Sequence, residues 1–297
     1  MTPASRRIAI RGASLACTVL GEAHTHPVIL LHGGRGIGNH AKDLQAYGAL
    51  ADRYRVIGFD MRGHGQSSLS GPLTFSQLVE DLEEVRQTLG GGRPMTLIGG
   101  SFGGMIALSY AVRYPHGLAH LVLRGTAPSW HHEAEAKQAF EARLHRAPMA
   151  TREMLDKLLS DQVTDDAELR LICFALSPMY EDRLDMNVAL ESARRIDVHA
   201  ATHNALFAVK DYDVREQLAS IRTPTLVVCG DQDWICPPGQ SRWIAQAIPG
   251  TRLLMVPGCG HYVHIEANTQ ELTEIRQLLG EGRPLGPAPT LPPASSR

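Results

Sequence analysis

The chain has 297 residues, and 43% of them are hydrophobic, so it can bury a sizeable core in one large domain. Its formal net charge of −2 excludes a strongly basic surface, and we expect neither nucleic acid nor membrane among its partners. No stretch approaches the roughly 18 apolar residues of a membrane-spanning helix, and the first residues lack the apolar run of a signal peptide. Five cysteines without a C-x-x-C pair predict reduced thiols in a cytoplasmic protein.

Short apolar runs alternate with helix-like runs through the first part of the chain. Strands are expected at residues 7–10, 14–19, 28–31, 56–59, 95–98 and 121–123, the first two as a hairpin. Helices are expected at 42–53, 74–89 and 105–114, with Thr74 as an N-cap. Apolar strands that alternate with helices are typical of a parallel sheet covered on both faces. We therefore predict an α/β fold, with a mostly parallel sheet flanked by helices.

The alternation ends after Thr126. Charge-rich, helix-favouring runs follow at 133–146, 152–161, 167–176, 184–195 and 198–209, with no strand candidate among them. Strands resume at 225–229 and 252–256, with helices at 238–248 and 269–279. We predict that residues 129–214 form an inserted all-helical cap over the carboxyl edge of the sheet, where open α/β sheets bind ligands. The core then comprises residues 1–128 and 215–281, and the proline-rich tail, 282–297, is expected to be disordered.

A glycine-rich segment, residues 99–104, joins an expected strand to an expected helix and contains the pattern G-x-S-x-G. A serine on so sharp a turn has strained backbone angles, and the glycines beside it let strand and helix pass closely. The turn exposes the Ser101 hydroxyl as a candidate nucleophile and directs the Phe102 N–H towards the oxygen that a reaction would charge. The alternative is a turn whose serine only caps the helix.

A serine nucleophile needs a base, and the base needs an acid that orients it. Two loops that follow expected strands further along the chain supply these groups, residues 230–237 and 258–262. His261 is the candidate base. Asp231 and Asp233 are both candidate acids. Asp231 directly follows a glycine, where an aspartate often binds the backbone of its own turn. We favour Asp233 because it lies deeper in the loop. The order serine, aspartate, histidine is the one expected of an α/β-hydrolase arrangement.

Backbone donors are also needed where the oxyanion forms. The glycine-rich loop of residues 32–36 would supply the Gly34 N–H beside that of Phe102, and His32 is expected to hold this loop from inside. The loop fits neither nucleotide-binding glycine pattern, and the histidines lack metal-binding spacing, so we expect no cofactor and no metal. The polar side chains of a neighbouring loop are interpreted as loop-tying groups: Asp60, Arg62 and His64.

Together these motifs resemble those of the α/β-hydrolase superfamily, in its capped branch. They are residues 32–36, 59–67, 99–104, 230–237 and 258–261 with Glu266. The His-Gly-Gly-x-Gly loop and residues 99–101 and 121–125 are further similar to proline iminopeptidases. The resemblance implies a Ser-His-Asp peptidase that releases an N-terminal residue without a cofactor. That family usually has proline where this chain has Arg35, and commonly tryptophan or tyrosine where it has Phe102.

The resemblance also implies that carboxylates of the cap hold the free amine of the substrate. Glu181 and Asp182 are the candidates, and the alternative for the acidic residues of this region is a solvated helix face. Trp234 and Tyr262, which lie in the two loops of the expected triad, are further candidate substrate contacts.

Other functions fit the same motifs. A carboxylesterase or lactonase and a carbon–carbon bond hydrolase would use the same triad. From another class, a non-catalytic small-ligand binding protein of this fold would show a broken triad, whereas this triad is complete. A serine at position 101 excludes the enzymes that use an aspartate nucleophile at this point. In each case the partner is a small molecule, and the oligomeric state is left open.

Overall fold

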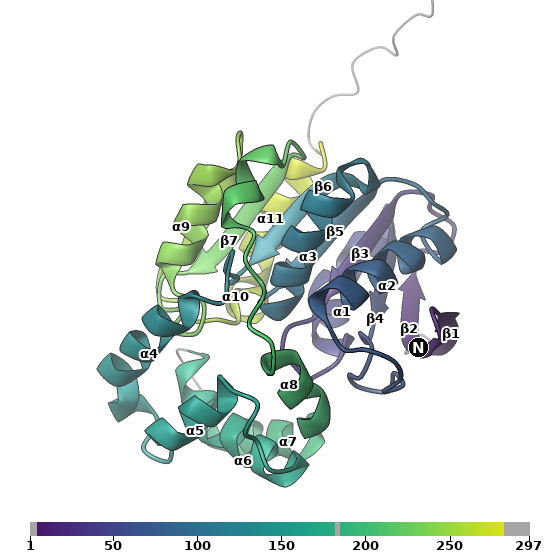
Figure 1. Cartoon of the computed structure of the whole chain (residues 1–297). Coiled ribbons are helices and arrows are strands. Elements are labelled where there is room, and N and C mark those ends of the chain that lie inside the picture. The colour runs from purple at the N-terminus through teal and green to yellow at the C-terminus, as the bar shows by residue number, and fades with distance from the viewer. Residues whose placement is uncertain (1–4, 182–184, 282–297) are drawn as a thin grey trace, which may run out of the picture.

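An eight-stranded sheet runs through the centre of the molecule in the order β1-β2-β4-β3-β5-β6-β7-β8 (Figure 1). The strands are β1 (Arg6–Ile10), β2 (Ala13–Leu20), β3 (Pro27–Leu31), β4 (Arg55–Phe59), β5 (Met95–Gly100), β6 (Leu118–Arg124), β7 (Thr225–Gly230) and β8 (Arg252–Val256). β1 and β2 form the expected hairpin, β2 also pairs antiparallel with β4, and the remaining neighbours are parallel. The prediction of a mostly parallel sheet is thus confirmed.

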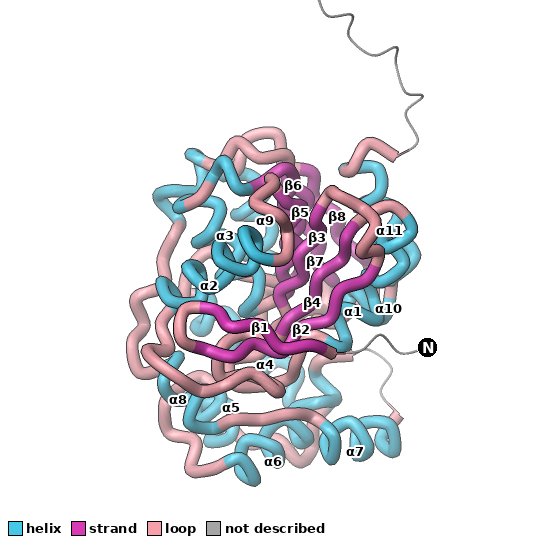
Figure 2. The backbone as a smooth tube through the Cα atoms, turned by 90° about the vertical axis from the view of Figure 1, so that its right-hand side faces the viewer, coloured by secondary structure: helices cyan, strands magenta, loops and turns pink. Residues whose placement is uncertain are grey.

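Helices cover both faces of this sheet (Figure 2). One face carries α2 (Phe75–Thr88), α3 (Phe102–Arg113) and α9 (Pro238–Ala247), and the other carries α1 (Ala41–Tyr47), α10 (Val263–Glu266) and α11 (Asn268–Leu278). β3 and β7 are buried at every position because both of their faces are covered. Thr74 caps α2 as expected, since its side chain accepts a hydrogen bond from the Gln77 N–H.

Between β6 and β7 the chain forms a group of helices that lies beyond one edge of the sheet (Figure 1). They are α4 (His132–Arg143), α5 (Arg152–Leu158), α6 (Asp166–Leu176), α7 (Met186–Arg195) and α8 (Ala200–Phe207). These helices share an apolar cluster that includes Phe140, Leu169 and Phe207. Trp234, from the loop after β7, joins the same cluster and so links the helices to the sheet.

The computed structural model describes residues 5–181 and 185–281. The predicted disorder of residues 282–297 therefore lies outside the described residues, as does the start of the helix expected at 184–195. No helix in the two described ranges combines the length and the hydropathy that crossing a membrane requires.

Two local predictions differ from the structure. The helix expected at 42–53 ends as α1 at Tyr47 and continues as a 3-10 turn over Gly48–Asp52, because glycine is a poor residue for a helix interior. The short helix α10 was not expected, since four residues are too few to show a helical period.

Candidate active site

Ser101 joins β5 to α3 in a strained turn, as the glycine pattern predicts. Its φ of 53° and ψ of −119° are unusual for a residue with a side chain. The Ser101 N–H donates to the Arg124 carbonyl at 2.8 Å, and the Ser101 carbonyl accepts from Thr126 Oγ1 at 2.8 Å. A side chain at Gly103 would come within 2.6 Å of the His32 carbonyl oxygen, so glycine lets α3 approach the end of β3. The strained turn is therefore held by hydrogen bonds to both the N–H and the carbonyl of Ser101.

His261 and Asp233 form a buried pair. His261 Nδ1 lies 2.8 Å from Asp233 Oδ2, and the two side chains are 5% and 0% exposed. The other oxygen of Asp233 accepts two backbone N–H groups of its own loop, at 3.1 and 3.0 Å, which fixes the carboxylate. Asp231 instead accepts the Gly258 N–H at 2.9 Å. The structure thus brings Asp233 to His261 and leaves Asp231 in a turn.

The pairing settles which ring nitrogen of His261 can exchange a proton. Because Nδ1 donates to Asp233, Nε2 is the nitrogen left to act on another group. In the described part of the chain no hydrogen bond joins Nε2 to the Ser101 hydroxyl. Such bonds commonly tighten only when substrate is bound. Gly125, which follows β6, lies close to the His261 ring, because a side chain at this position would come within 3.2 Å of His261 Nδ1.

The two N–H groups expected to bind the oxyanion belong to different elements. Gly34 lies in the loop after β3 with a φ of +84°, a left-handed conformation that favours glycine, and Phe102 opens α3. Neither N–H donates to another described residue. The loop lies against the serine, since a side chain at Gly33 would come within 3.1 Å of Ser101 Cβ. This arrangement can donate two hydrogen bonds to an oxygen held at Ser101.

Two neutral histidines hold the loop that contains Gly34. His32 Nδ1 donates to the Gly33 carbonyl at 2.9 Å, and its Nε2 accepts the Met61 N–H at 3.2 Å. His64 Nε2 accepts the Gly36 N–H at 2.8 Å. Burial lowers the pKa of His64 to about 3, so its ring stays neutral and can accept. His32 therefore holds the loop from inside, as expected.

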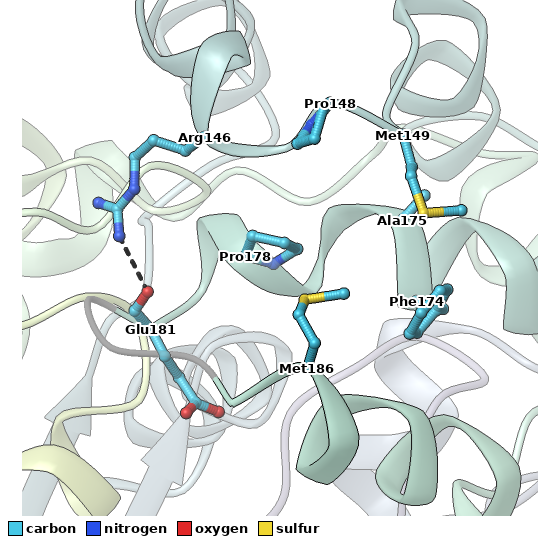
Figure 3. A pocket seen from close by; sticks show the side chains of 8 residues that line it. All are labelled: Arg146, Pro148, Met149, Phe174, Ala175, Pro178, Glu181 and Met186. Carbon is cyan, nitrogen blue, oxygen red and sulfur yellow. Dashed lines mark hydrogen bonds between the residues drawn. The ribbon is translucent and has the colours of Figure 1, made fainter.

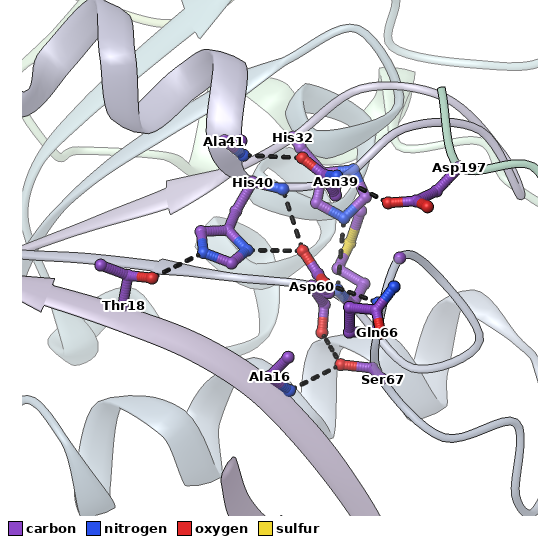
Figure 4. A network of polar contacts seen from close by, with 12 residues as sticks. Ala16, Thr18, His32, Asn39, His40, Ala41, Asp60, Gln66, Ser67 and Asp197 are labelled. Carbon is purple, nitrogen blue, oxygen red and sulfur yellow. Dashed lines mark hydrogen bonds and ion pairs between the residues drawn. The ribbon is translucent and has the colours of Figure 1, made fainter. Parts of the chain in front are cut away.

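Asp60 is the centre of a structural network beside this loop (Figure 4). Its Oδ1 accepts from His40 Nδ1 at 2.5 Å and from the His40 N–H at 3.0 Å, and its Oδ2 accepts the Gln66 N–H at 2.8 Å. Burial tends to raise the pKa of Asp60, but the hydrogen bonds from His40 and Gln66 outweigh it and lower that pKa. These contacts agree with a loop-tying role. Within the described ranges, no group of three or more His, Cys, Asp or Glu side chains is arranged to hold a metal.

Glu181 lies beside a cavity of about 440 Å³ between the helices that follow β6 (Figure 3). The cavity is lined by Arg146, Pro148, Met149, Phe174, Ala175, Pro178, Glu181 and Met186. Burial raises the pKa of Glu181 above its ordinary value. Asp182, the other acidic candidate, lies outside the described residues. None of the expected triad lines this cavity. The residue that precedes Glu181, however, contacts His261.

That residue is Tyr180, whose contact with His261 could not be predicted from the sequence. Its carbonyl accepts the His261 N–H at 2.9 Å, and its ring centroid lies 5.6 Å from that of His261. Tyr262 is half-buried and stacks on Tyr180 at 5.4 Å. Trp234 is fully buried and packs edge-on against Tyr180 at 5.3 Å, so the structure places it in packing rather than at an accessible surface. No local pattern marks Tyr180, because only folding brings it to the histidine.

Comparisons with known proteins agree with this geometry. Residues 26–268 match the family model described as alpha/beta hydrolase fold. The chain is 42% identical over 275 residues to proline iminopeptidase PfmaB of Pestalotiopsis fici, covering 92% of this chain and 98% of that protein. It is 30% identical over 270 residues to a proline iminopeptidase of Xylella fastidiosa, covering 81% and 85% of the two chains.

A solved structure is similar over nearly the whole molecule. The crystal structure of a hydrolase from Pseudomonas aeruginosa PA01 matches with a TM-score of 0.72 and 28% identity, covering 94% of this chain and 100% of that one. Sheet order, strained serine turn and family match point the same way. The chain belongs to the α/β-hydrolase family, and it is an enzyme of that fold.

Proposed function

We propose that this enzyme is a serine hydrolase that works through an acyl-enzyme on Ser101. The observation that carries the proposal is the 2.8 Å contact between His261 and Asp233 at the same sheet edge as the strained serine. His261 Nε2 takes the proton as Ser101 Oγ bonds to the substrate carbonyl carbon. It returns that proton to the departing group as the carbonyl–leaving group bond breaks, and water then releases the acyl group by the same route.

Asp233 and the backbone donors have supporting roles in this mechanism. The Asp233 carboxylate holds His261 in one tautomer and stabilises the imidazolium that forms. The N–H groups of Gly34 and Phe102 stabilise the oxyanion, and each such donor is worth roughly 3–4 kcal/mol. No step needs a metal or an organic cofactor.

As substrate we propose an amide or ester of a small molecule, with an N-terminal prolyl amide as the first choice. The names of the two curated relatives support this choice. We further propose that residues 129–214 act as a cap, because Tyr180 from this segment contacts His261 directly. Glu181, next in the chain and partly desolvated, is the carboxylate proposed to meet the substrate ammonium. The five free cysteines fit the cytoplasmic location that we propose for the enzyme.

The substrate proposal is tested with matched arylamides. The kcat/KM of proline arylamide is compared with that of N-acetylproline arylamide, and short-chain nitrophenyl esters and lactones complete the panel. An aminopeptidase prefers the free amine strongly, because an unpaired buried carboxylate is costly. Equal rates on both arylamides, or cleavage of esters and lactones alone, would contradict the peptidase proposal and favour an esterase or lactonase.

A further inference from the structure

Arg35 is a buried cation in the loop that carries the proposed oxyanion donor. It lies between Gly34 and Gly36 and is 8% exposed. Its guanidinium carbon lies 4.1 Å from the ring centroid of Phe207 and 5.6 Å from those of Phe75 and Phe102. Its Nη2 donates to the Met105 sulfur at 3.5 Å, and sulfur is a weak acceptor. Three aromatic faces and a thioether therefore surround the charge.

The other buried arginines are all paired with carboxylates. Arg62 meets Asp81 at 2.7 Å, Arg86 meets Glu83 at 2.6 Å, and Arg124 meets Asp43 at 2.9 Å. Arg35 makes no ion pair with any carboxylate of the described residues. A buried charge without a partner is costly, and cation–π contacts recover only part of that cost. Arg35 thus differs from the other three buried arginines, each of which forms an ion pair with a carboxylate.

The acidic side chain whose charge acts most strongly on Arg35 does not fill this role. Glu133 acts on Arg35 through space, but it forms its own ion pair with Lys210. Burial lowers the pKa of Arg35 to about 10, and the group still carries its full charge at neutral pH. His132 is also close enough to interact, and burial lowers its pKa to about 4, so it is neutral. Arg35 therefore forms no ion pair within the described residues, although the charges of Glu133 and Asp233 act in the same neighbourhood.

The Arg35 charge lies close to the proposed reaction centre. Phe102, whose ring it contacts, directly follows Ser101, and Ser101 itself is only half-buried. Burial raises the pKa of the Cys236 thiol, and the Asp233 charge raises it further, while the Ser101 hydroxyl and the Arg35 charge act in the opposite direction.

We propose that Arg35 is a substrate-binding residue, and that the group it binds is a carboxylate of the substrate. The proposal rests on the serine-hydrolase mechanism proposed above and narrows its substrates to those with an anionic group near the scissile bond. A planar guanidinium can hold a carboxylate through two parallel hydrogen bonds. The carboxylate can belong to the acyl part, as in a dicarboxylic monoester, or to the departing part, as in a prolyl dipeptide.

The experiment uses two matched pairs of substrates on the wild type and on Arg35→Met. The first pair is 4-nitrophenyl hydrogen glutarate and 4-nitrophenyl pentanoate, which differ in a carboxylate on the acyl part. The second is Pro-Gly and Pro-Gly amide, which differ in a carboxylate on the departing part. The wild type should favour the charged member of one pair by on the order of 10- to 100-fold in kcat/KM, and Arg35→Met should abolish that preference. The pair that responds identifies the side on which the carboxylate lies.

Two further variants separate charge from packing. Arg35→Lys should keep part of the preference, since the charge remains while the fork geometry is lost. Phe207→Leu removes the closest ring and should keep the preference for the carboxylate. Because each preference is a ratio measured on one protein, a general loss of activity or folding cancels. A ratio near one in the wild type on both pairs, or one that Arg35→Met leaves unchanged, would overturn the proposal.

A binding measurement keeps the inference separate from the proposed function. Calorimetric titration with glutarate and with glutaramide needs no turnover. Tighter binding of glutarate by the wild type than by Arg35→Met supports the anion site, whether or not the four substrates are cleaved. Failure to cleave any of the four substrates would count against the hydrolase proposal alone. Equal binding of glutarate by the two proteins overturns the anion site whatever the kinetics show.

Discussion

Asp233 uses its two carboxylate oxygens for different partners, and this division sets its expected effect on catalysis. One oxygen meets His261 at 2.8 Å, and the other accepts backbone N–H groups that fix the loop. Asp233→Asn should lower kcat roughly 10⁴-fold, because the amide holds the imidazole in the wrong tautomer. Asp231→Asn, which leaves that pair intact, is the matched control and should change kcat little. Steady-state kinetics on both variants checks this, and the opposite ranking would assign the acid to Asp231.

At the scale of elements, the close approach of α3 to β3 determines the position of Ser101. A side chain at Gly103 would overlap the backbone at the end of β3, which cannot move without disturbing the sheet. Gly103→Ala should therefore lower Tm and activity together, with a stability loss of about 1–3 kcal/mol or more. Gly48→Ala is the matched control: Gly48 has a helical φ of −58°, and the added methyl group would meet only the end of the Leu20 side chain, Cδ1 at 3.3 Å, which can shift slightly. Thermal unfolding of both variants checks this, and equal Tm values would refute the proposed close approach.

At the scale of the whole molecule, a buried network of polar and charged side chains joins α1, the end of β6 and α11. Tyr47 in α1 donates to Glu271 in α11 at 2.7 Å, and Arg124 at the end of β6 meets both Tyr47 and Asp43. Burial raises the pKa of Glu271 to about 7, against the opposing effect of the Arg124 charge. The folded protein thus binds this proton more tightly than the unfolded chain does.

That pKa shift predicts a pH dependence of stability. The folded-state pKa of Glu271 lies above its unfolded value of about 4.5, so its favourable contribution is complete below pH 4.5 and is lost as pH rises through 7. Glu271→Gln removes the ionisation, and its unfolding free energy relative to wild type should rise by up to about 3 kcal/mol between pH 4.5 and 8. Urea unfolding at both pH values measures this, with Glu22→Gln, an exposed carboxylate, as control. A pH-independent difference for Glu271→Gln would contradict the prediction.

The parts of this molecule that could be predicted from sequence are those encoded by neighbouring residues. Six consecutive residues determine the β5–α3 turn. Asp233 and His261 each follow a strand of the parallel sheet, and the carboxyl ends of parallel strands lie at one edge of the sheet. Tyr180 reaches His261 only through tertiary packing, and no periodic pattern marks it. The substrate contact of Trp234 stays a prediction; the structure shows its indole buried in the apolar cluster of the helices, a packing that the loop sequence does not encode.

The central claim is that Ser101 carries the covalent step, and its most direct test is Ser101→Ala. The variant is assayed on whichever substrate of the panel the wild type cleaves fastest, with circular dichroism and Tm as controls for folding. Loss of the nucleophile should lower kcat on the order of 10⁶-fold while the fold is retained. A folded Ser101→Ala protein that keeps a substantial fraction of the wild-type kcat would contradict the account.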